Sequence, residues 1–316
     1  MKKTAYFIIS IFVLFCIFVS PAVLHAQTTW FVDDDAPGDP GPGDPAVSDP
    51  LEDGSASHPF DAIQEGIDAS SSGDTVLVLD GTYTGVGNRD MDFNGKAITV
   101  RSENGAETCI IDCQASDMDP HRGFYFHSGE NLDSVVDGFT IQNGYANGST
   151  PEERSGGAIH CYASSPAIIN NTIDANRSAG GDSAGGGGLF CYDSFSLISN
   201  NIFSSNIVFS AWSNGGGIFC VDSYPIISQN TLSGNYVNYG HGGGIRCSGG
   251  YASITDCTIT GNSIGEGDGG GLSCESATIS QCTVTGNWAG YWSGGGIGLG
   301  SGEITDCTIS NNQTGV

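Results

Sequence analysis

The sequence predicts an all-β protein, a right-handed parallel β-helix with three short strands per coil and a short N-terminal capping helix. Six repeat copies fill residues 156–316, and the last strand segment of each copy ends in an asparagine, here called its terminal asparagine. The spacing between successive terminal asparagines falls from 30 residues (Asn176 to Asn206) to 25 (Asn287 to Asn312). Inside each copy apolar residues alternate with polar ones, as in GGGIFCV and NTLSGN. Such alternation with frequent turns is typical of stacked short strands. No copy has an uninterrupted stretch long enough for a helical repeat.

Equivalent positions of the copies form columns, because coils of a parallel β-helix stack about 4.8 Å apart. One column holds the terminal asparagines, and we expect its buried amides to bond to one another along the axis. A second column changes from asparagine to cysteine, and a third consists of cysteines that we expect to be buried free thiols. The three columns are Asn176, Asn206, Asn235, Asn262, Asn287 and Asn312; Asn171, Asn201, Asn230, Cys257, Cys282 and Cys307; and Cys161, Cys191, Cys220, Cys247 and Cys274.

Residues 1–26 are predicted to be a cleavable signal peptide, since Lys2 and Lys3 precede an apolar run that ends before Ala26. We therefore expect a secreted, periplasmic or cell-surface protein with no membrane-spanning segment after cleavage. Loss of two lysines leaves 7 basic (9 minus 2) and 35 acidic residues, a charge of −28 (7 minus 35). A surface of this charge excludes nucleic acid as a partner and repels polyuronates that carry no bound cation.

Residues 27–57 are expected to hold a first strand and an acidic loop rich in proline and glycine. The loop is either solvated or a calcium site, since clustered carboxylates favour a cation. No EF-hand spacing is present, and the residues for such a site are Asp33, Asp34, Asp35 and Asp53.

Residues 58–155 are expected to hold the capping helix, with Phe60, Ile63 and Ile67 on one face, and then irregular first coils. A helix at this place covers strand edges that the first coil would otherwise expose. Polar residues gather between Asp119 and Glu130, and we interpret them as a surface loop. In CIIDC, Cys109 and Cys113 are the cysteines that we expect to be bridged or reactive, or else simply core positions.

The loops between each terminal asparagine and the next glycines vary most, and all emerge at one corner of the coil. Variable loops on a rigid scaffold are where binding is expected. One residue per loop should turn inward (Val208, Val237, Ile264 and Ala289), while exposed aromatic rings either bind sugars or a partner surface or cover one another. These aromatic residues are Trp212, Tyr236, Tyr239, Trp288, Tyr291 and Trp292.

Two pairs of residues are candidates for catalysis. His241 and Asp268 each lie six residues after a terminal asparagine, so they should be neighbours, either for acid–base chemistry or as a surface ion pair. Asp193 and Asp222 occupy equivalent turns, and about 5 Å between them would suit a retaining glycosidase or calcium. The second pair lies at the far end of the coil's first strand, so the two pairs cannot form one site.

The opening PFDAIQEGID, with GDTV and GTY after it, and the GGGI and TIxxN elements of the coils resemble the pectin-lyase-like right-handed β-helix superfamily. The chain looks most like the exported β-helix repeat proteins of planctomycete-type bacteria. Its repeats also resemble those of the polymorphic outer-membrane proteins of chlamydiae, which are surface adhesins. The resemblance covers about residues 28–316 and implies the fold. It does not imply one activity, because such folds include lyases, hydrolases, epimerases and non-catalytic surface proteins.

The elements that resemble catalytic motifs are incomplete. GHG at His241 resembles polygalacturonases, but the upstream aspartate pair is missing and Arg246 lies in the same copy. A pectate-lyase-like site needs a base beside calcium-binding acids, and the only arginines of the repeats are Arg177 and Arg246. We therefore expect non-catalytic binding of a polysaccharide or cell-surface component. The alternative is a calcium-dependent polysaccharide lyase or glycoside hydrolase. The sequence ends without a capping element, so we expect it to be part of a longer chain.

Overall fold

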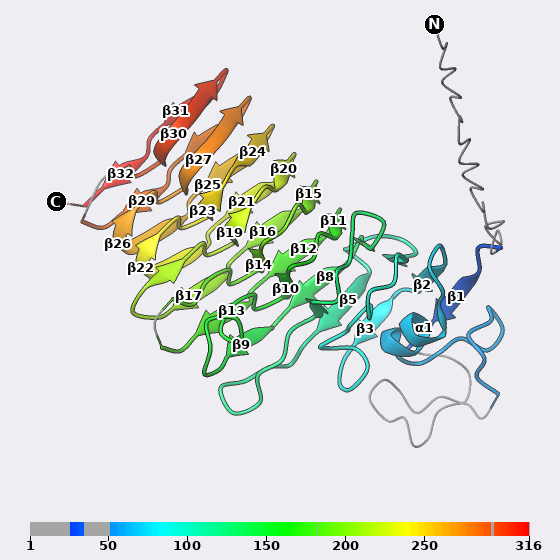
Figure 1. Ribbon diagram of the computed structural model, residues 1–316. Helices are drawn as coiled ribbons and strands as arrows, with labels where there is room; N and C mark the ends of the chain where they lie inside the picture. Colours follow the sequence, from blue (N-terminus) through cyan, green and yellow to red (C-terminus); the bar gives the residue numbers. More distant parts are fainter. Residues whose placement is uncertain (1–25, 35–50, 182, 292–293, 316) are drawn as a thin grey trace, which may run out of the picture.

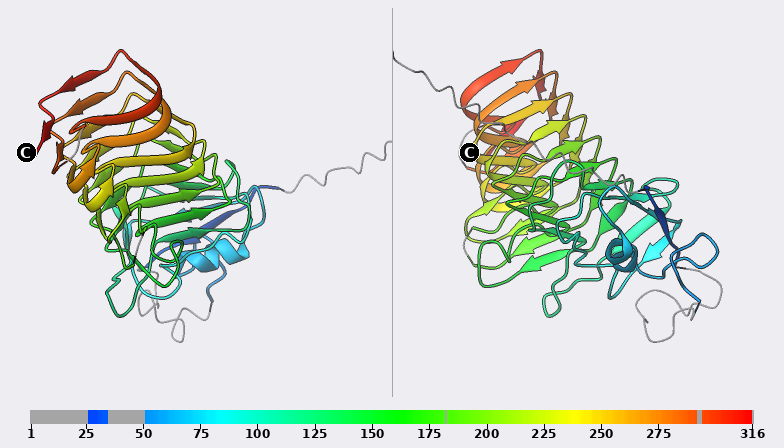
Figure 2. Two further views of the ribbon diagram at one scale, coloured as in Figure 1. Left: turned by 60° about the vertical axis from the view of Figure 1, so that its left-hand side comes forward. Right: turned by 45° about the vertical axis from the view of Figure 1, so that its right-hand side comes forward.

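The computed structural model describes residues 26–34, 51–181, 183–291 and 294–315. The strands form three parallel sheets of 15, 9 and 8 strands that wrap into one solenoid (Figures 1 and 2). This confirms the predicted right-handed parallel β-helix, in which each coil contributes to three sheets. The predicted signal peptide, apart from Ala26, and most of the acidic loop lie outside the described residues.

The largest sheet receives two segments from each regular coil, and these fuse into single long strands near the C-terminus. One column consists of β6 (Phe124–Phe126), β10 (Ile159–Tyr162), β14 (Leu189–Tyr192), β19 (Ile218–Ser223) and β23 (Ile245–Gly250). The other consists of β1 (Thr29–Val32), β2 (Thr75–Val78), β4 (Thr99–Ser102), β7 (Val135–Asp137), β11 (Ala167–Ile169), β15 (Leu197–Ser199), β20 (Ile226–Ser228) and β24 (Ala252–Thr255). Both columns continue in β27 (Leu272–Ser280) and β30 (Ile297–Thr305).

The two smaller sheets complete the coils. The second sheet contains β3 (Gly81–Tyr83), β5 (Cys109–Asp112), β8 (Thr140–Gln142), β12 (Thr172–Asp174), β16 (Ile202–Ser204), β21 (Thr231–Ser233), β25 (Thr258–Thr260), β28 (Thr283–Thr285) and β31 (Thr308–Ser310). The third contains β9 (Tyr145–Asn147), β13 (Arg177–Ala179), β17 (Ile207–Phe209), β18 (Ser213–Asn214), β22 (Tyr236–His241), β26 (Ser263–Asp268), β29 (Trp288–Ala289) and β32 (Gln313–Thr314). The segments between each terminal asparagine and the next glycines, which the sequence predicted to be loops, form the strands of this third sheet, and β22 and β26 span two of these segments completely.

The helix α1 (Ile63–Ala69) packs against β1 and β2 at the N-terminal end of the solenoid (Figure 1). Ile63 and Ile67 are fully buried, as the apolar face of the sequence predicts. Phe60, the third residue predicted for that face, lies before the helix and instead forms a β-bridge with Val32. Gly66 permits the close approach, because a Cβ there would lie 2.7 Å from Val76. The helix has seven residues, and no helix in the described part of the chain is long and apolar enough to cross a membrane.

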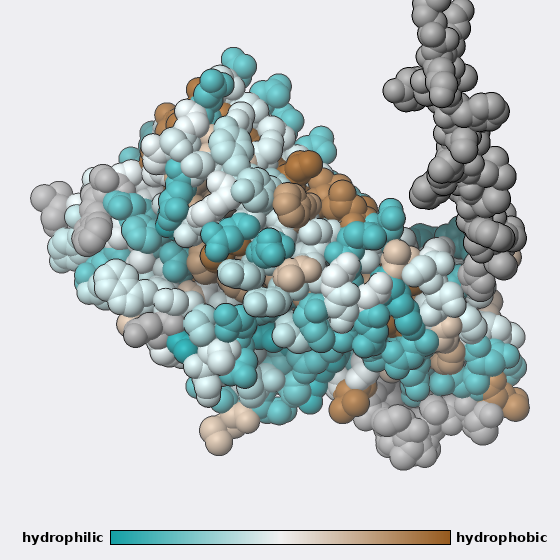
Figure 3. All heavy atoms as spheres, viewed as in Figure 1, coloured by the Kyte–Doolittle hydropathy of each residue, from teal (hydrophilic) through white to brown (hydrophobic). Residues whose placement is uncertain are grey.

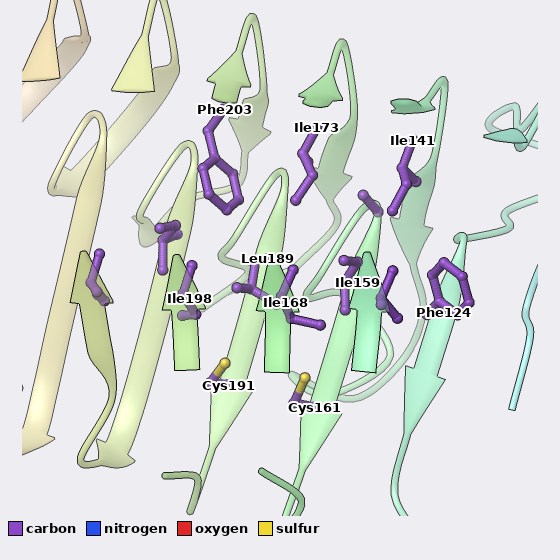
Figure 4. Close-up of a cluster of buried hydrophobic side chains, with 14 of the residues drawn as sticks. Phe124, Ile141, Ile159, Cys161, Ile168, Ile173, Leu189, Cys191, Ile198 and Phe203 are labelled. Carbon is purple, nitrogen blue, oxygen red and sulfur yellow. The ribbon is translucent and has the colours of Figure 1, made fainter. Parts of the chain in front are cut away.

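The interior is filled by columns of inward apolar side chains. Figure 4 shows Ile159 and Leu189 of the largest sheet pointing toward Ile173 and Phe203 of the second sheet. All four side chains are fully buried. The outer surface is largely hydrophilic on the face in Figure 3, as expected for a chain with a net charge of −26.

The terminal asparagines form the predicted buried ladder. The Asn206 amide donates to the Ile173 carbonyl (2.8 Å) and to the Asn235 Oδ1 (3.0 Å), and the Asn206 backbone N–H donates to the same Oδ1 (3.1 Å). The Asn235 amide in turn donates to the Asn262 Oδ1 at 2.8 Å. Each buried amide is therefore satisfied by the neighbouring coil, which avoids the cost of an unpaired polar group.

All ten cysteines in the described part of the chain are free thiols, and nine of them are buried. Of the two alternatives for Cys109 and Cys113, the structure supports core positions instead of a bridged or reactive pair. Both thiols lie in the core, and burial raises the pKa of each well above its usual range. A thiol with a raised pKa is a poor nucleophile, so these residues serve as core filler.

Candidate functional site

A groove opens on the outer side of the strand column that contains β10, β14, β19 and β23. His160, Phe190 and Phe219 occupy equivalent positions in β10, β14 and β19, and their rings lie 5.1 and 5.5 Å apart. All three side chains are at least nine-tenths buried. The next position is Arg246 and the one after it Ser273, and there a groove of about 470 Å³ opens. The site thus begins where the covered aromatic column ends.

Arg246 and Glu275 form the central ion pair of this groove. The Arg246 guanidinium donates to the Glu275 carboxylate at 2.7 Å and to the Ser273 hydroxyl at 3.1 Å. Glu275 also accepts hydrogen bonds from the Ser248 hydroxyl (3.2 Å) and the Gly249 N–H (3.1 Å). The Gly249 N–H, followed by the charge of Arg246, lowers the pKa of Glu275. The pair therefore stays ionised and fixed at neutral pH.

His241 and Asp268 also line the groove. They are register partners in β22 and β26, as their spacing in the sequence predicts. The His241 Nδ1 lies 4.0 Å from the Asp268 Oδ2, which is longer than a hydrogen bond. Burial and then the charge of Arg246 lower the pKa of His241, while Asp268 opposes the shift. The imidazole is consequently neutral at neutral pH.

Exposed aromatic rings adjoin the groove on the side of His241. Trp212, Tyr239 and Glu266 line a smaller cavity of about 70 Å³ that shares His241 with the groove. A hydrogen bond to Glu266 raises the pKa of Tyr239. The predicted ligand-binding rings are exposed to different degrees: Trp212 by 59%, Tyr291 by 66%, Tyr239 by 41% and Trp288 by 40%.

Two of the aromatic residues predicted to bind a ligand remain, Tyr236 and Trp292. Tyr236 is half-buried, and its ring lies 5.9 Å from that of Phe209. Trp292 lies outside the described residues. Beneath the loops Val208, Val237 and Ile264 are fully buried with Ala184 and Ala289, as predicted for the inward residues of this corner.

Rings elsewhere on the surface behave differently. Phe195 and Tyr224 are exposed but stack face to face, with centroids 5.2 Å apart and planes at 10°. Within the described part of the chain, Trp212, Tyr239 and Trp288 stack on no other ring. Among the corner rings that the structure describes, Phe209 and Tyr236 are the pair that covers one another. Trp212, Tyr239 and Trp288 therefore expose part of their rings to solvent.

The acidic candidates lie apart from this groove. Asp193 and Asp222 occupy equivalent left-handed turn positions in neighbouring coils (φ 48° and 47°), and neither lines the groove. Asp34 accepts a hydrogen bond from the Thr82 N–H (2.8 Å), whereas Asp53 accepts one from the Ser55 N–H (3.0 Å). Asp33 is described, but Asp35 lies outside the described residues, so a calcium site built from these aspartates stays a prediction.

A different carboxylate cluster was not predicted. Glu52, Asp61 and Glu65 bring their oxygens within 4.8 Å of one another beside α1. Burial, a hydrogen bond with Asp61 and the charge of Glu52 raise the pKa of Glu65 to about 7. The acids belong to a loop, a turn and a helix, so no sequence spacing reveals them. They lie at the opposite end of the solenoid from β26 and β29 (Figure 1).

Glu65→Gln is expected to stabilise the protein above neutral pH. A carboxyl whose pKa rises from 4.5 to about 7 on folding favours the folded state while protonated, and the unfolding free energy falls as pH rises through this range. Because Glu65 is partly exposed, we expect a gain of only about 1 kcal/mol at about pH 8 and none near pH 4.5. Thermal melting with a chelator present measures it. A lower melting temperature for Glu65→Gln at the higher pH would contradict the prediction.

A second polar cluster holds the irregular first coils together. His121 contacts Asp90 through Nδ1 and lies 3.1 Å from Asp119 through Nε2. Arg122 donates to the carbonyls of Glu153 and Gly156. Since these groups already bond to one another, we interpret the cluster as structural.

No family model matches the chain, and no curated protein matches it. Among solved structures, a rhamnogalacturonan lyase is 12% identical over 92% of this chain and 87% of its own, with a TM-score of 0.39. A mannuronic acid specific polysaccharide family 6 lyase from human gut microbiota is 15% identical over 90% of this chain and 83% of its own, with a TM-score of 0.24. Likenesses this weak carry no argument about activity.

Proposed function

We propose that this right-handed parallel β-helix binds a glycan at the aromatic corner and the adjoining groove, without cleaving it. The observation that carries the proposal is a set of exposed rings: Trp212 and Tyr239 line the cavity that shares His241 with the polar groove around Arg246, and Trp288 is exposed on the third sheet. Aromatic faces pack on the apolar faces of sugar rings, and a few fixed polar groups then select hydroxyls.

The rigidity of the scaffold supports this proposal. Tyr239, Gly240 and His241 pair in register with Glu266, Gly267 and Asp268 of the next coil. Gly240 and Gly267 stack closely, because a Cβ on Gly267 would lie within 1.8 Å of the Gly240 carbonyl oxygen. A binding surface held in this way loses little conformational entropy when a ligand binds.

The groove supports binding better than turnover. His241 and Asp268 lie 4.0 Å apart, beyond hydrogen-bond distance, so Asp268 does not orient the imidazole. Arg246, the arginine of the groove, is neutralised by Glu275. The described part of the chain holds one group of three metal-ligating side chains, and it lies beside α1 instead of in the groove. A calcium-dependent lyase or glycoside hydrolase stays the alternative hypothesis, and it rests on the fold, His241 and Asp268.

A glycan array and pull-down with insoluble polysaccharides test the proposal. We expect the protein to retain at least one glycan without releasing soluble products, and absence of binding across the array would refute the proposal. In parallel, incubation with pectin and alginate in calcium tests the alternative. Ultraviolet absorbance of unsaturated uronides, lost in His241→Ala, would establish a lyase. The predicted signal peptide fits a ligand met outside the cytoplasm, and cell fractionation checks that prediction.

A further inference from the structure

We infer that the groove selects an uncharged glycan, and that Glu275 is the residue that excludes uronates. The inference rests on the proposed function and specifies its ligand class. It follows from the way in which Glu275 occupies the Arg246 guanidinium, which is otherwise the natural partner for a sugar carboxylate.

The geometry of the ion pair carries the first step. Glu275 approaches Arg246 to 2.7 Å, and the bonds from Ser248 and Gly249 hold the carboxylate in place. The Arg246 side chain is only 12% exposed, whereas that of Glu275 is 53% exposed. A ligand entering the groove therefore meets the carboxylate first. To bind Arg246, a uronate would have to displace Glu275, and this exchange of one carboxylate for another gains no electrostatic energy.

The other charged residues of the site also disfavour binding of a uronate. Asp268 lines the groove and Glu266 lines the adjoining aromatic cavity, while His241 is neutral at neutral pH. A sugar carboxylate placed beside these acids would be repelled, because like charges close together near a protein surface repel one another. An uncharged sugar meets no such repulsion, and its hydroxyls donate well to carboxylates. The groove thus favours a neutral polymer that stacks on Trp212 and Tyr239.

Matched titrations test the inference. Hexamers of glucose, mannose, xylose, galacturonate and mannuronate are titrated into the wild type, Glu275→Gln and the control Glu107→Gln, at low and high sodium chloride. Glu107 is an exposed acid of an early coil, so its replacement changes the net charge equally. We expect the wild type to bind a neutral hexamer at least about tenfold more tightly than either uronate, with little salt dependence.

Glu275→Gln should free Arg246, so we expect uronate affinity to rise by at least about tenfold and the gained binding to weaken with salt. Glu107→Gln should leave the preference unchanged. Glu275→Ser, which introduces the residue found at the equivalent position Ser248, provides a second variant if glutamine disturbs folding. A wild type that binds uronates as tightly as neutral hexamers, or folded variants that gain no uronate affinity, would overturn the inference while the proposed function stands. Absence of binding to every glycan would instead overturn the proposed function.

Discussion

Replacing Trp212 and Trp288 together by alanine is expected to weaken glycan binding by at least about 100-fold. Each ring is an exposed aromatic surface with no stacking partner in the described part of the chain, so its face is available to a sugar. Loss of an aromatic anchor at the centre of an interface costs roughly 1–2 kcal/mol or more, and about 1.4 kcal/mol corresponds to a tenfold change in affinity. Because both side chains are exposed, the fold should remain intact.

The matched control is Phe195→Ala with Tyr224→Ala. These rings are exposed by 57% and 51%, similarly to Trp212, but their faces are stacked on each other. We expect calorimetric titration with the preferred glycan to show unchanged affinity for this control and a small decrease in melting temperature. Equal losses in both double variants would indicate a nonspecific effect of surface aromatics. Unchanged binding in the tryptophan variant would remove the observation on which the proposed function depends.

Asn201→Cys is expected to lower the unfolding free energy by about 3 kcal/mol. The Asn201 Oδ1 accepts hydrogen bonds from the backbone and side chain of Asn171, and its amide donates to the Asn230 Oδ1 and the Ile168 carbonyl. Cysteine replaces these with weak sulfur contacts, like that of the Cys257 thiol with the Ile227 carbonyl at 3.7 Å. Each buried polar group left without a partner costs about 1–3 kcal/mol.

Asn230→Cys is the matched comparison, and its expected cost is only about 1 kcal/mol. Asn230 is the last asparagine before Cys257, so its replacement moves the existing junction by one coil. Asn201→Cys instead creates two additional junctions inside the asparagine column. Denaturant unfolding under reducing conditions measures both values, and Cys257→Asn, which lengthens the asparagine column, should be neutral or stabilising. Equal costs for Asn201→Cys and Asn230→Cys would show that the amides do not act as a ladder.

The sequence predicted those residues of the site that occupy the same position in successive repeat copies. His241 and Asp268 were placed as neighbours by counting from their terminal asparagines, and β22 and β26 confirm that register. The exposure of Trp212 and Trp288 also followed from the variable segments of the sequence that contain them, although Trp288 begins strand β29 instead of lying in a loop. Their binding and catalytic roles remain predictions. Glu275 was not predicted, because its neighbours in the column, Ser248 and Gly300, lack charge and only the packed groove shows what it contacts.

Columns, register and inward positions were determined by the sequence alone. Each coil hydrogen-bonds to the next at a spacing of about 4.8 Å, so equivalent positions of a repeat must stack. Which outward residues are covered was decided only by the tertiary structure. His160 and Arg246 occupy equivalent outward positions, yet one is buried and the other borders an open groove. The trio Glu52, Asp61 and Glu65 likewise meets only after the helix packs. Loops and caps pack through contacts between residues distant in sequence, and no repeat period encodes them.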